Sequence, residues 1–287
     1  MITKSLFYDH TVFSFEIFPP KRTAPINTVY HTLESLRELC PDFISVTYGA
    51  GGSAINSATL QIATDINQKY GVESVAHLPC LYLSRKQAVQ RVKELTESGI
   101  ENILALRGDA VPNKRPLRDF AHASDLIAFL KGFDKFHIMA ACYPEVHPEA
   151  PDMDTDIQHL KEKTDAGASH LISQLFLDNS CFYTFLQKVR ADGITVPVEA
   201  GIMPVINKKQ IQHMVSLCGA SLPEKFRTMM DRYEDNPEAM RDAGIAYAVD
   251  QIVDLIAHGV DGIHLYTMNN PLVAHKIHEA TKTLFQH

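Results

Sequence analysis

The 287-residue sequence predicts an α/β fold, a single (β/α)8 TIM barrel with extra helices before the last strand. Short apolar stretches alternate with amphipathic helical stretches from one end to the other, which is the pattern of parallel βα units. About eight such strands occur, the number that closes a barrel, and no linker interrupts them. Because barrels of this length are common as single units, residues 1–287 are expected to form one domain.

The first half of the chain supplies four predicted strands, at residues 12–18, 43–48, 74–78 and 102–106. Predicted helices at 27–39, 55–69 and 85–98 separate them, and a flexible glycine-rich turn at 49–53 follows the second strand. Gly71 and Gly99 are expected to end the helices that precede them, because glycine closes a helix in the left-handed conformation. The N-terminal residues are expected to run directly into the first strand.

The second half repeats the pattern with predicted strands at 136–142, 170–175, 195–200 and 262–266. The segments 166–167, 192–193 and 258–260 resemble one another as helix-to-strand turns. Residues 207–259 hold more helix than one βα unit needs. We therefore predict an added helix at 222–233 before a long helix at 237–257, forming a lid or a subunit contact.

Polar side chains lie in or just after most of the predicted strands, nearly all in the C-terminal half of the strand. Barrel active sites are built at this end of the strands. Several polar groups converging on one rim predict a substrate pocket, and the alternative is an interior water network. The residues are Glu16, Thr47, His77, Arg107, Asp109, Tyr143, Gln174 and Tyr266.

Glu16 is a carboxylate in an otherwise apolar strand that ends at Pro19 and Pro20. Strand residues alternate between two faces, so Glu16 shares a face with Ser14, opposite Phe15. We expect this carboxyl to be partly desolvated, with a raised pKa, as suits a proton donor near neutral pH. The alternative is a structural acid paired with an interior Arg or Lys.

Composition excludes several classes of function. The formal net charge of -7 and the pI of about 6.0 disfavour a nucleic-acid surface. No run of about 18 apolar residues suggests a membrane span, and the start of the chain has no apolar signal core, so a cytoplasmic protein is expected.

The cysteine and histidine patterns do not predict a metal site. The five cysteines are widely spaced, with no Cys-x-x-Cys pair, and the histidines show no zinc spacing. His147 could be grouped with Glu145 and Glu149, but the prolines among them prevent one helical face from presenting all three.

Seven sequence strings are more specific than the architecture. They are FEIFPPK at 15–21, SVTYGA at 45–50, ALRGD at 105–109, ACYPEVHPEA at 141–150, DAGA at 165–168, QLFLD at 174–178 and HLYTMN at 264–269. In this order, and over essentially the whole chain, they closely resemble the bacterial methylenetetrahydrofolate reductases.

This resemblance implies a flavoprotein that uses FAD to pass a hydride from NADH or NADPH to 5,10-methylenetetrahydrofolate, in ping-pong fashion, giving 5-methyltetrahydrofolate. It also implies a homo-oligomer. The chain has no Gly-x-Gly-x-x-Gly fingerprint, which agrees with a flavin held on a barrel rim rather than in a Rossmann domain.

The resemblance assigns roles to individual residues. Glu16 matches the general acid, and Asp109 matches the aspartate beside flavin and pterin. Positions that line the FAD match Thr47, His77, Leu106, Arg107, Gly108, Asp109, Tyr143, His147, Asp156 and Lys163. Substrate-binding positions match Glu16, Gln174, Gln210, Met214 and Tyr266.

Reduction of methylenetetrahydrofolate requires the same types of residue. The methylene carbon of the folate accepts a hydride only after one of its carbon–nitrogen bonds opens to an iminium ion, so an acid such as Glu16 must protonate the departing nitrogen. Ionised Asp109 would favour the developing cation. Gln174 can hydrogen-bond ring amides, and Arg107 and Lys163 are candidate partners for the pyrophosphate.

Two positions depart from the family pattern. Met214 stands where some members have a phenylalanine that packs on both substrates, and Asn270 where some have an arginine.

Two other functions remain open at this point, a proline-dehydrogenase-like flavin barrel and a non-catalytic folate- or flavin-binding subunit. The sequence also leaves open whether NADH, NADPH or a protein reduces the flavin.

Overall fold

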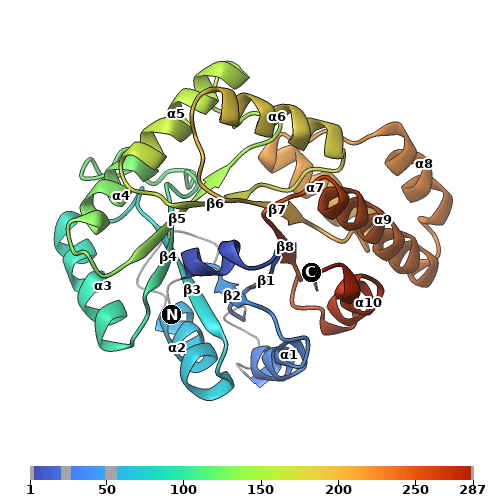
Figure 1. The fold of residues 1–287 in the computed structure, drawn as a ribbon, viewed down its shortest axis with the longest axis horizontal. Coiled ribbons are helices and arrows are strands. Elements are labelled where there is room, and N and C mark those ends of the chain that lie inside the picture. The colour runs from blue at the N-terminus through green and yellow to red at the C-terminus, as the bar shows by residue number, and fades with distance from the viewer. Residues whose placement is uncertain (1–2, 21–26, 49–56, 286–287) are drawn as a thin grey trace.

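Eight parallel strands close into a barrel in the order β1 to β8, with β1 paired to both β2 and β8 (Figure 1). The structure is a computed structural model that describes residues 3–20, 27–48 and 57–285. The strands are β1 (Val12–Ile17), β2 (Phe43–Val46), β3 (Glu73–Pro79), β4 (Asn102–Leu106), β5 (His137–Cys142), β6 (His170–Ser173), β7 (Val198–Ile202) and β8 (Gly262–Tyr266). The predicted TIM barrel is confirmed.

Helices surround the barrel, and three of them, α7 to α9, lie between β7 and β8 (Figure 1). The helices are α1 (Asn27–Arg37), α2 (Ser57–Tyr70), α3 (Arg85–Glu97), α4 (Ala123–Lys131), α5 (Met153–Asp165), α6 (Asn179–Ala191), α7 (Lys208–Cys218), α8 (Glu224–Tyr233), α9 (Pro237–Ala257) and α10 (Pro271–Thr281). Extra helices before the last strand are thus confirmed.

Local sequence signals explain where several helices begin and end. Ser84 accepts a hydrogen bond from the backbone N–H of Gln87, whose side chain bonds back to Ser84, forming a capping box at the start of α3. Gly71 and Gly99 follow α2 and α3 with positive φ angles of 67° and 72°. Both therefore close helices as expected.

The predicted position of the seventh strand was wrong by about three residues. The strand runs from Val198 to Ile202 rather than over 195–200. Pro197 has no N–H to donate and contributes only its carbonyl, which accepts from the backbone of Leu171 at 2.9 Å. The sixth strand also ends earlier than predicted, at Ser173. The predicted turn at 49–53 lies outside the described residues.

A short 3-10 helix, η1 (Thr3–Tyr8), precedes β1, so the chain does not run directly into the first strand as expected (Figure 1). The backbone N–H of Thr3 donates to Oδ1 of Asn102 at 3.0 Å, and its hydroxyl lies 2.7 Å from Nδ1 of His137. The ring of Phe7 meets that of His170 edge-on at 4.4 Å. Because Asn102 and His137 begin β4 and β5, η1 covers the N-terminal end of the barrel, and a ligand must enter at the other end.

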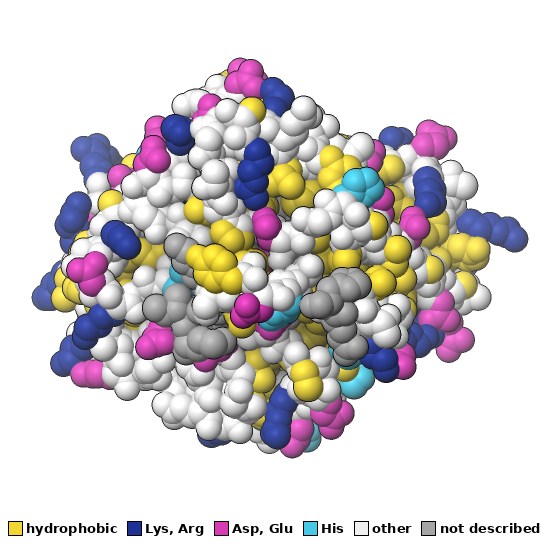
Figure 2. Space-filling view, in the orientation of Figure 1, with side chains coloured by type: hydrophobic (Ala, Val, Ile, Leu, Met, Phe, Trp, Pro, Cys, Tyr) yellow, Lys and Arg dark blue, Asp and Glu magenta, His cyan; other side chains and the backbone are white. Residues whose placement is uncertain are grey.

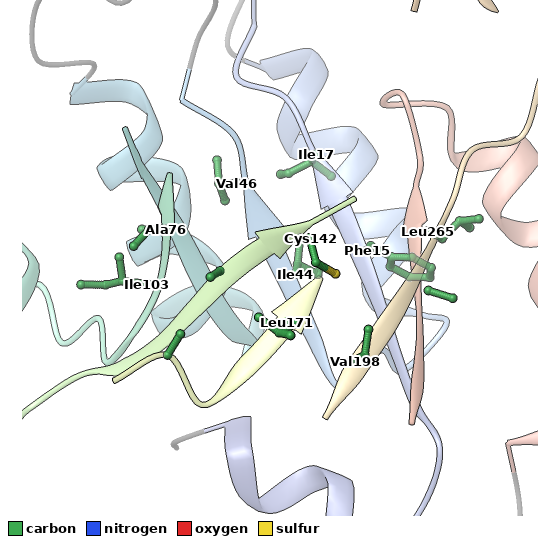
Figure 3. Packing of buried hydrophobic residues seen from close by; sticks show 14 of the residues in the cluster. Phe15, Ile17, Ile44, Val46, Ala76, Ile103, Cys142, Leu171, Val198 and Leu265 are labelled. Carbon is green, nitrogen blue, oxygen red and sulfur yellow. The ribbon is translucent and has the colours of Figure 1, made fainter. Parts of the chain in front are cut away.

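The strands alternate between an outer core and the barrel interior. Phe15 and Ile17 of β1, with Ile44 and Val46 of β2, pack in the apolar layer between sheet and helices (Figure 3). A smaller apolar layer inside the barrel consists of Val12, Phe43, Val75, Leu104, Met139 and Ile172. Glu16 alternates with Phe15 and Ile17 along β1, so its side chain projects into the interior.

The surface shows mixed charge. Lys and Arg side chains are interspersed with Asp and Glu around the margin of the face shown in Figure 2, with no broad basic patch on that face. Among the described helices, none is long and apolar enough to cross a membrane.

Candidate active site

Glu16 is buried in the wall of the barrel and faces two histidines. Its side chain lies near the C-terminal end of β1 with 8% of the residue exposed. Oε2 of Glu16 is 3.6 Å from Nε2 of His77 and 3.9 Å from Nε2 of His264. Within the described residues, no Arg or Lys forms an ion pair with this carboxylate. The alternative of an acid paired with an interior Arg or Lys therefore does not fit the described part of the chain.

His77 and Thr47 lie at the ends of neighbouring strands and present polar atoms that lack partners. Nε2 of His77 and Oγ1 of Thr47 are buried, and neither has a hydrogen-bond partner among the residues that the structure describes. Burial lowers the pKa of His77 to about 4, although nearby Glu16 acts in the opposite direction. His77 is therefore neutral near pH 7, and a ligand can satisfy both atoms.

The loop after β4 brings its backbone close to β3. Gly108 has a φ of +82°, and a Cβ at this position would lie 2.9 Å from Cβ of Pro79. Only glycine fits here without strain. The Leu106 carbonyl accepts from the backbone of Cys80 at 3.0 Å, which fixes the strand end, while Asp109 is exposed beyond it.

Arg107 forms a two-pronged ion pair with Glu149, with both N···O distances at 2.6 Å. The hydrogen bond with Glu149 raises the pKa of Arg107, and the same contact lowers that of Glu149. The Glu149 side chain is 58% exposed, so the pair adds at most about 1 kcal/mol of stability. A phosphate group could therefore take the place of Glu149 at small cost.

The loop after β5 is tied to α5. The rings of Tyr143 and His147 meet edge-on at 4.6 Å, and the backbone N–H of His147 donates to Oδ2 of Asp156 at 2.9 Å. Nζ of Lys163 donates to the carbonyl of Ala141 at 3.0 Å. Burial lowers the pKa of Lys163, opposed by the charge of Asp156. Lys163 is thus held beneath the rim rather than in solvent.

The metal grouping considered around His147 does not form. Across 3–20, 27–48 and 57–285, no three His, Cys, Asp or Glu side chains gather as a metal ion would require.

Gln174 and Tyr266 use part of their hydrogen-bonding capacity within the protein. Oε1 of Gln174 accepts a hydrogen bond from the backbone N–H of Leu175 at 2.8 Å. This bond does not use the NH2 group of Gln174. The Tyr266 hydroxyl donates to the Ser173 carbonyl at 2.6 Å. A Cβ on Gly201 would lie 2.7 Å from that hydroxyl, so glycine makes room for it. The Tyr266 hydroxyl proton is therefore already used within the protein.

Helix α7 carries the other two predicted substrate residues. Met214 is partly buried and packs against a second apolar cluster, which includes Leu177, Ile211 and Tyr266. Gln210 is exposed in the first turn of the helix, where its N–H donates to Oδ1 of Asn207 at 3.0 Å. Asn270, in the place of the arginine of some relatives, accepts from the backbone of Val273 at the start of α10.

Sequence reasoning missed a group of buried polar side chains behind Glu16. Oγ of Ser14 lies 2.7 Å from Oε1 of Glu199 and 2.6 Å from Nδ1 of His264. The signal was present, because Glu199 is a carboxylate between apolar strand residues, as Glu16 is.

Judged on the residues that the structure describes, the rim combines a buried acid without an Arg or Lys partner, two polar atoms without hydrogen-bond partners, and basic groups from the loop after β4 and from α5. The sequence model of a family described as "Methylenetetrahydrofolate reductase" matches residues 2–282. The chain belongs to the methylenetetrahydrofolate reductase family.

Named relatives of this reductase family agree. The chain is 38% identical over 264 residues to the 5,10-methylenetetrahydrofolate reductase of Pectobacterium carotovorum subsp. carotovorum, covering 92% of this chain and 88% of that protein. It is 34% identical to the Escherichia coli (strain K12) enzyme of the same name, with the same coverage. Identity to methylenetetrahydrofolate reductase (NADH) 1 of Arabidopsis thaliana is also 34%, over 90% of this chain but only 46% of the plant protein.

Solved structures share the fold of this reductase at low sequence identity. A Clostridium thermocellum protein, described as binding two copies of 5-methyl-5,6,7,8-tetrahydrofolic acid, superposes with a TM-score of 0.71 at 14% identity, covering 100% of both chains. A dihydropteroate synthase from Coxiella burnetii gives 0.53 at 15% identity, covering 96% and 94%. At these identities the similarity demonstrates the fold alone.

The function follows from family membership. The protein is an oxidoreductase of folate one-carbon metabolism that reduces methylenetetrahydrofolate with NAD(P)H. Family membership therefore rejects the two other functions left open by the sequence, the proline-dehydrogenase-like flavin barrel and the non-catalytic subunit.

Proposed function

We propose that the C-terminal rim of the barrel binds FAD, and that NAD(P)H and methylenetetrahydrofolate use this rim in turn, with Glu16 as the proton donor to the folate. The observation that carries the proposal is the buried Glu16 carboxyl, which has no Arg or Lys partner among the described residues and lies 3.6 Å from a neutral His77. A carboxyl in this setting can hold and release a proton without breaking an ion pair.

The residues around the rim fit FAD. Oγ1 of Thr47 and Nε2 of His77, which have no hydrogen-bond partner within the described parts of the chain, offer hydrogen bonds to a polar ring edge. Gly108 lets the backbone approach a ligand closely, and Arg107 can exchange its exposed partner Glu149 for a phosphate. Lys163 and Asp156 sit below the Tyr143–His147 pair and support its loop. Leu106 would complete the lining.

FAD, when bound, supplies the hydride transfer that no amino-acid side chain provides. The chain's own residues do the rest. Glu16 donates its proton to the folate nitrogen whose bond to the methylene carbon opens. Asp109 places a negative charge near the resulting cation, and the NH2 group of Gln174 binds the pterin. Gln210, Met214 and the Tyr266 ring border the pocket from the side of α7 and β8.

Three broader features belong to the same proposal. We infer that residues 1–287 act as one domain, because one closed barrel can supply both the flavin and the folate contacts. A homo-oligomer in the cytoplasm is supported by the resemblance to bacterial relatives.

Absorption spectroscopy of the purified protein tests the cofactor. We expect flavin bands near-stoichiometric with protein, and a lower flavin content in Thr47→Val, which keeps the side-chain shape but removes the hydroxyl. Thr64→Val is the control, because the hydroxyl of Thr64 bonds to the Leu60 carbonyl within α2. A protein without flavin that gains none from added FAD contradicts the proposal, as does full flavin content in Thr47→Val.

A further inference from the structure

A continuous row of buried polar side chains crosses the barrel interior behind Glu16. Glu199 lies 2.7 Å from Ser14 Oγ, and Ser14 Oγ lies 2.6 Å from Nδ1 of His264. The other ring nitrogen of His264, Nε2, lies 3.3 Å from Ser45 Oγ and 3.9 Å from Oε2 of Glu16. The row thus joins one buried carboxyl to another through a hydroxyl and an imidazole.

The strand register builds this row. Ser14 is paired with His264 across β1 and β8, and Glu199 is paired with Gly262 across β7 and β8. A Cβ on Gly262 would lie 2.7 Å from Cγ of Glu199, so the glycine creates the space that the carboxylate side chain fills. The side chains of Glu199 and His264 have no exposed surface, so solvent does not reach them from the sides.

The charges in this interior are few. Burial raises the pKa of Glu199 to about 7. It lowers the pKa of His170 to about 3 and that of His77 to about 4, so both rings are neutral near pH 7. Nε2 of His170 is 2.9 Å from Oε2 of Glu199, but the two atoms are not aligned for a hydrogen bond. Neither atom has another hydrogen-bond partner within the described chain. Among the described residues, Glu199 therefore has no cationic partner that would keep it ionised.

We propose that Ser14 and His264 form a proton relay between Glu199 and Glu16, and that Glu199 returns a proton to Glu16 after each folate reduction. This inference rests on the proposed role of Glu16 as the acid. It makes Glu199 a positioning and proton-storage residue that does not touch the substrate.

The proton balance closes without any further reactant. Before transfer, Glu199 is protonated, Nε2 of His264 carries the imidazole proton and Glu16 is ionised. Glu199 then gives its proton to Ser14 Oγ, Ser14 gives its own to Nδ1 of His264, and His264 gives the Nε2 proton to Glu16. Glu16 ends protonated and Glu199 ionised, while Ser14 and His264 are again neutral.

In the final state the Ser14 hydroxyl donates to ionised Glu199, and the 2.7 Å separation of Oγ and Oε1 suits this hydrogen bond. The last step needs the Glu16 carboxyl to rotate toward His264, because 3.9 Å exceeds hydrogen-bond length. Between turnovers, water in the open pocket supplies a proton to Glu16, and the same row carries it back to Glu199, because the Glu199 side chain itself has no exposed surface.

Coupling of this kind makes the two carboxyls titrate as a pair. They lose their protons in two steps whose midpoints belong to the pair, and the negative charge of one carboxylate disfavours ionisation of the other. The other groups that face the pair also set this pH. They are Ser14 on β1, Asp42 before β2, Ser45 on β2, His77 on β3, His170 on β6, Asp261 before β8, and His264 and Tyr266 on β8.

NMR of isotope-labelled glutamate carboxyl carbons tests the coupling without any catalysis. The Glu16 signal is the one lost in Glu16→Gln. We expect its midpoint in the intact protein to fall by about one pH unit in Glu199→Gln and in Ser14→Ala. Ser74→Ala is the matched control, since Ser74 is equally buried and its hydroxyl has no hydrogen-bond partner in the described chain. An unmoved Glu16 midpoint in Glu199→Gln and Ser14→Ala overturns the relay.

The pH profile of folate reduction in a single turnover gives a second readout. The alkaline limb should move to lower pH in Glu199→Gln and Ser14→Ala and stay in place in Ser74→Ala. A uniform loss of rate without a shift would indicate a purely structural role and reject the relay. If Glu16→Gln still reduces folate while the NMR coupling is present, the assigned acid is wrong and the carboxyl pair stands.

Discussion

Nε2 of His77 lies 3.6 Å from Oε2 of Glu16, and the two side chains face each other at the ends of β3 and β1. The imidazole is neutral near pH 7 because burial lowers its pKa to about 4. His77 therefore does not form a permanent ion pair with Glu16. This arrangement allows an acid to change its protonation state in each catalytic cycle.

Asp109 is expected to tune the flavin through its charge. In Asp109→Asn the loss of a nearby negative charge should make the flavin easier to reduce, raising its two-electron midpoint potential by ~20 mV or more, the effect of a unit charge at a few Å in water. Potentiometric titration of the flavoprotein measures this.

Asp165→Asn is the control for the Asp109 measurement. Asp165 is also an exposed aspartate, but it ends α5 and therefore lies at the opposite face of the barrel. A potential unchanged within error in Asp109→Asn would place this side chain outside the reach of the flavin.

Met214 is expected to pack on both substrates in a shared pocket. Met214→Ala should raise the KM for NAD(P)H and for the folate by roughly tenfold, because about 1.4 kcal/mol of apolar contact is lost. Met214→Phe should be tolerated, since an aromatic ring fills similar space. Steady-state kinetics should give the parallel lines of a ping-pong mechanism.

Leu217→Ala provides the comparison on the same helix, because Leu217 is 63% exposed. Intersecting lines in the two-substrate plot would reject the shared pocket. Unchanged Michaelis constants in Met214→Ala would show that α7 borders some other surface.

His170 should make the protein sensitive to acid. The pKa of His170 is about 3 in the folded protein, against 6.5 ordinarily, because the ring is buried. Between these values the unfolded chain binds a proton that the folded chain does not, so stability falls as pH falls. The loss should reach roughly 3 kcal/mol by about pH 4.

Urea unfolding at a series of pH values checks this, with His170→Gln expected to lose less stability on acidification. Glu199 works in the opposite direction, because its pKa is raised to about 7, and it remains present in both proteins. His213→Gln, which changes an exposed histidine on α7, should leave the profile as it is. Equal acid sensitivity in His170→Gln would contradict the assigned cause.

Much of the fold could be predicted because each βα unit carries its own signals. The strands at 102–106 and 262–266 have the predicted bounds, since polar residues or glycine flank clear apolar runs. The extent of β7 was not predictable in this way. Gly201 disfavours a strand by itself, and it is explained by the Ser173 carbonyl and the Tyr266 side chain, both distant in sequence, which a Cβ at this position would meet at 2.2 and 2.7 Å.

The inward direction of a strand residue is predictable from sequence, whereas the contacts within the candidate site are not. The inward face of Glu16 followed from strand alternation. The pairing of Arg107 with Glu149 and the row from Glu199 to His264 join residues 42 to 250 positions apart, and no local pattern specifies such pairs. Lys163 shows the same limit, because its contact with the Ala141 carbonyl depends on how α5 packs against β5.

The role of Glu16 as proton donor is tested most directly by stopped-flow measurement of the two half-reactions in Glu16→Gln. Reduction of the bound flavin by NAD(P)H should proceed at close to the normal rate, because that half-reaction needs no proton from Glu16. Oxidation of the reduced variant by methylenetetrahydrofolate should slow by about 10² to 10⁴, the usual contribution of a general acid. Rapid oxidation of the reduced variant by the folate would contradict the account.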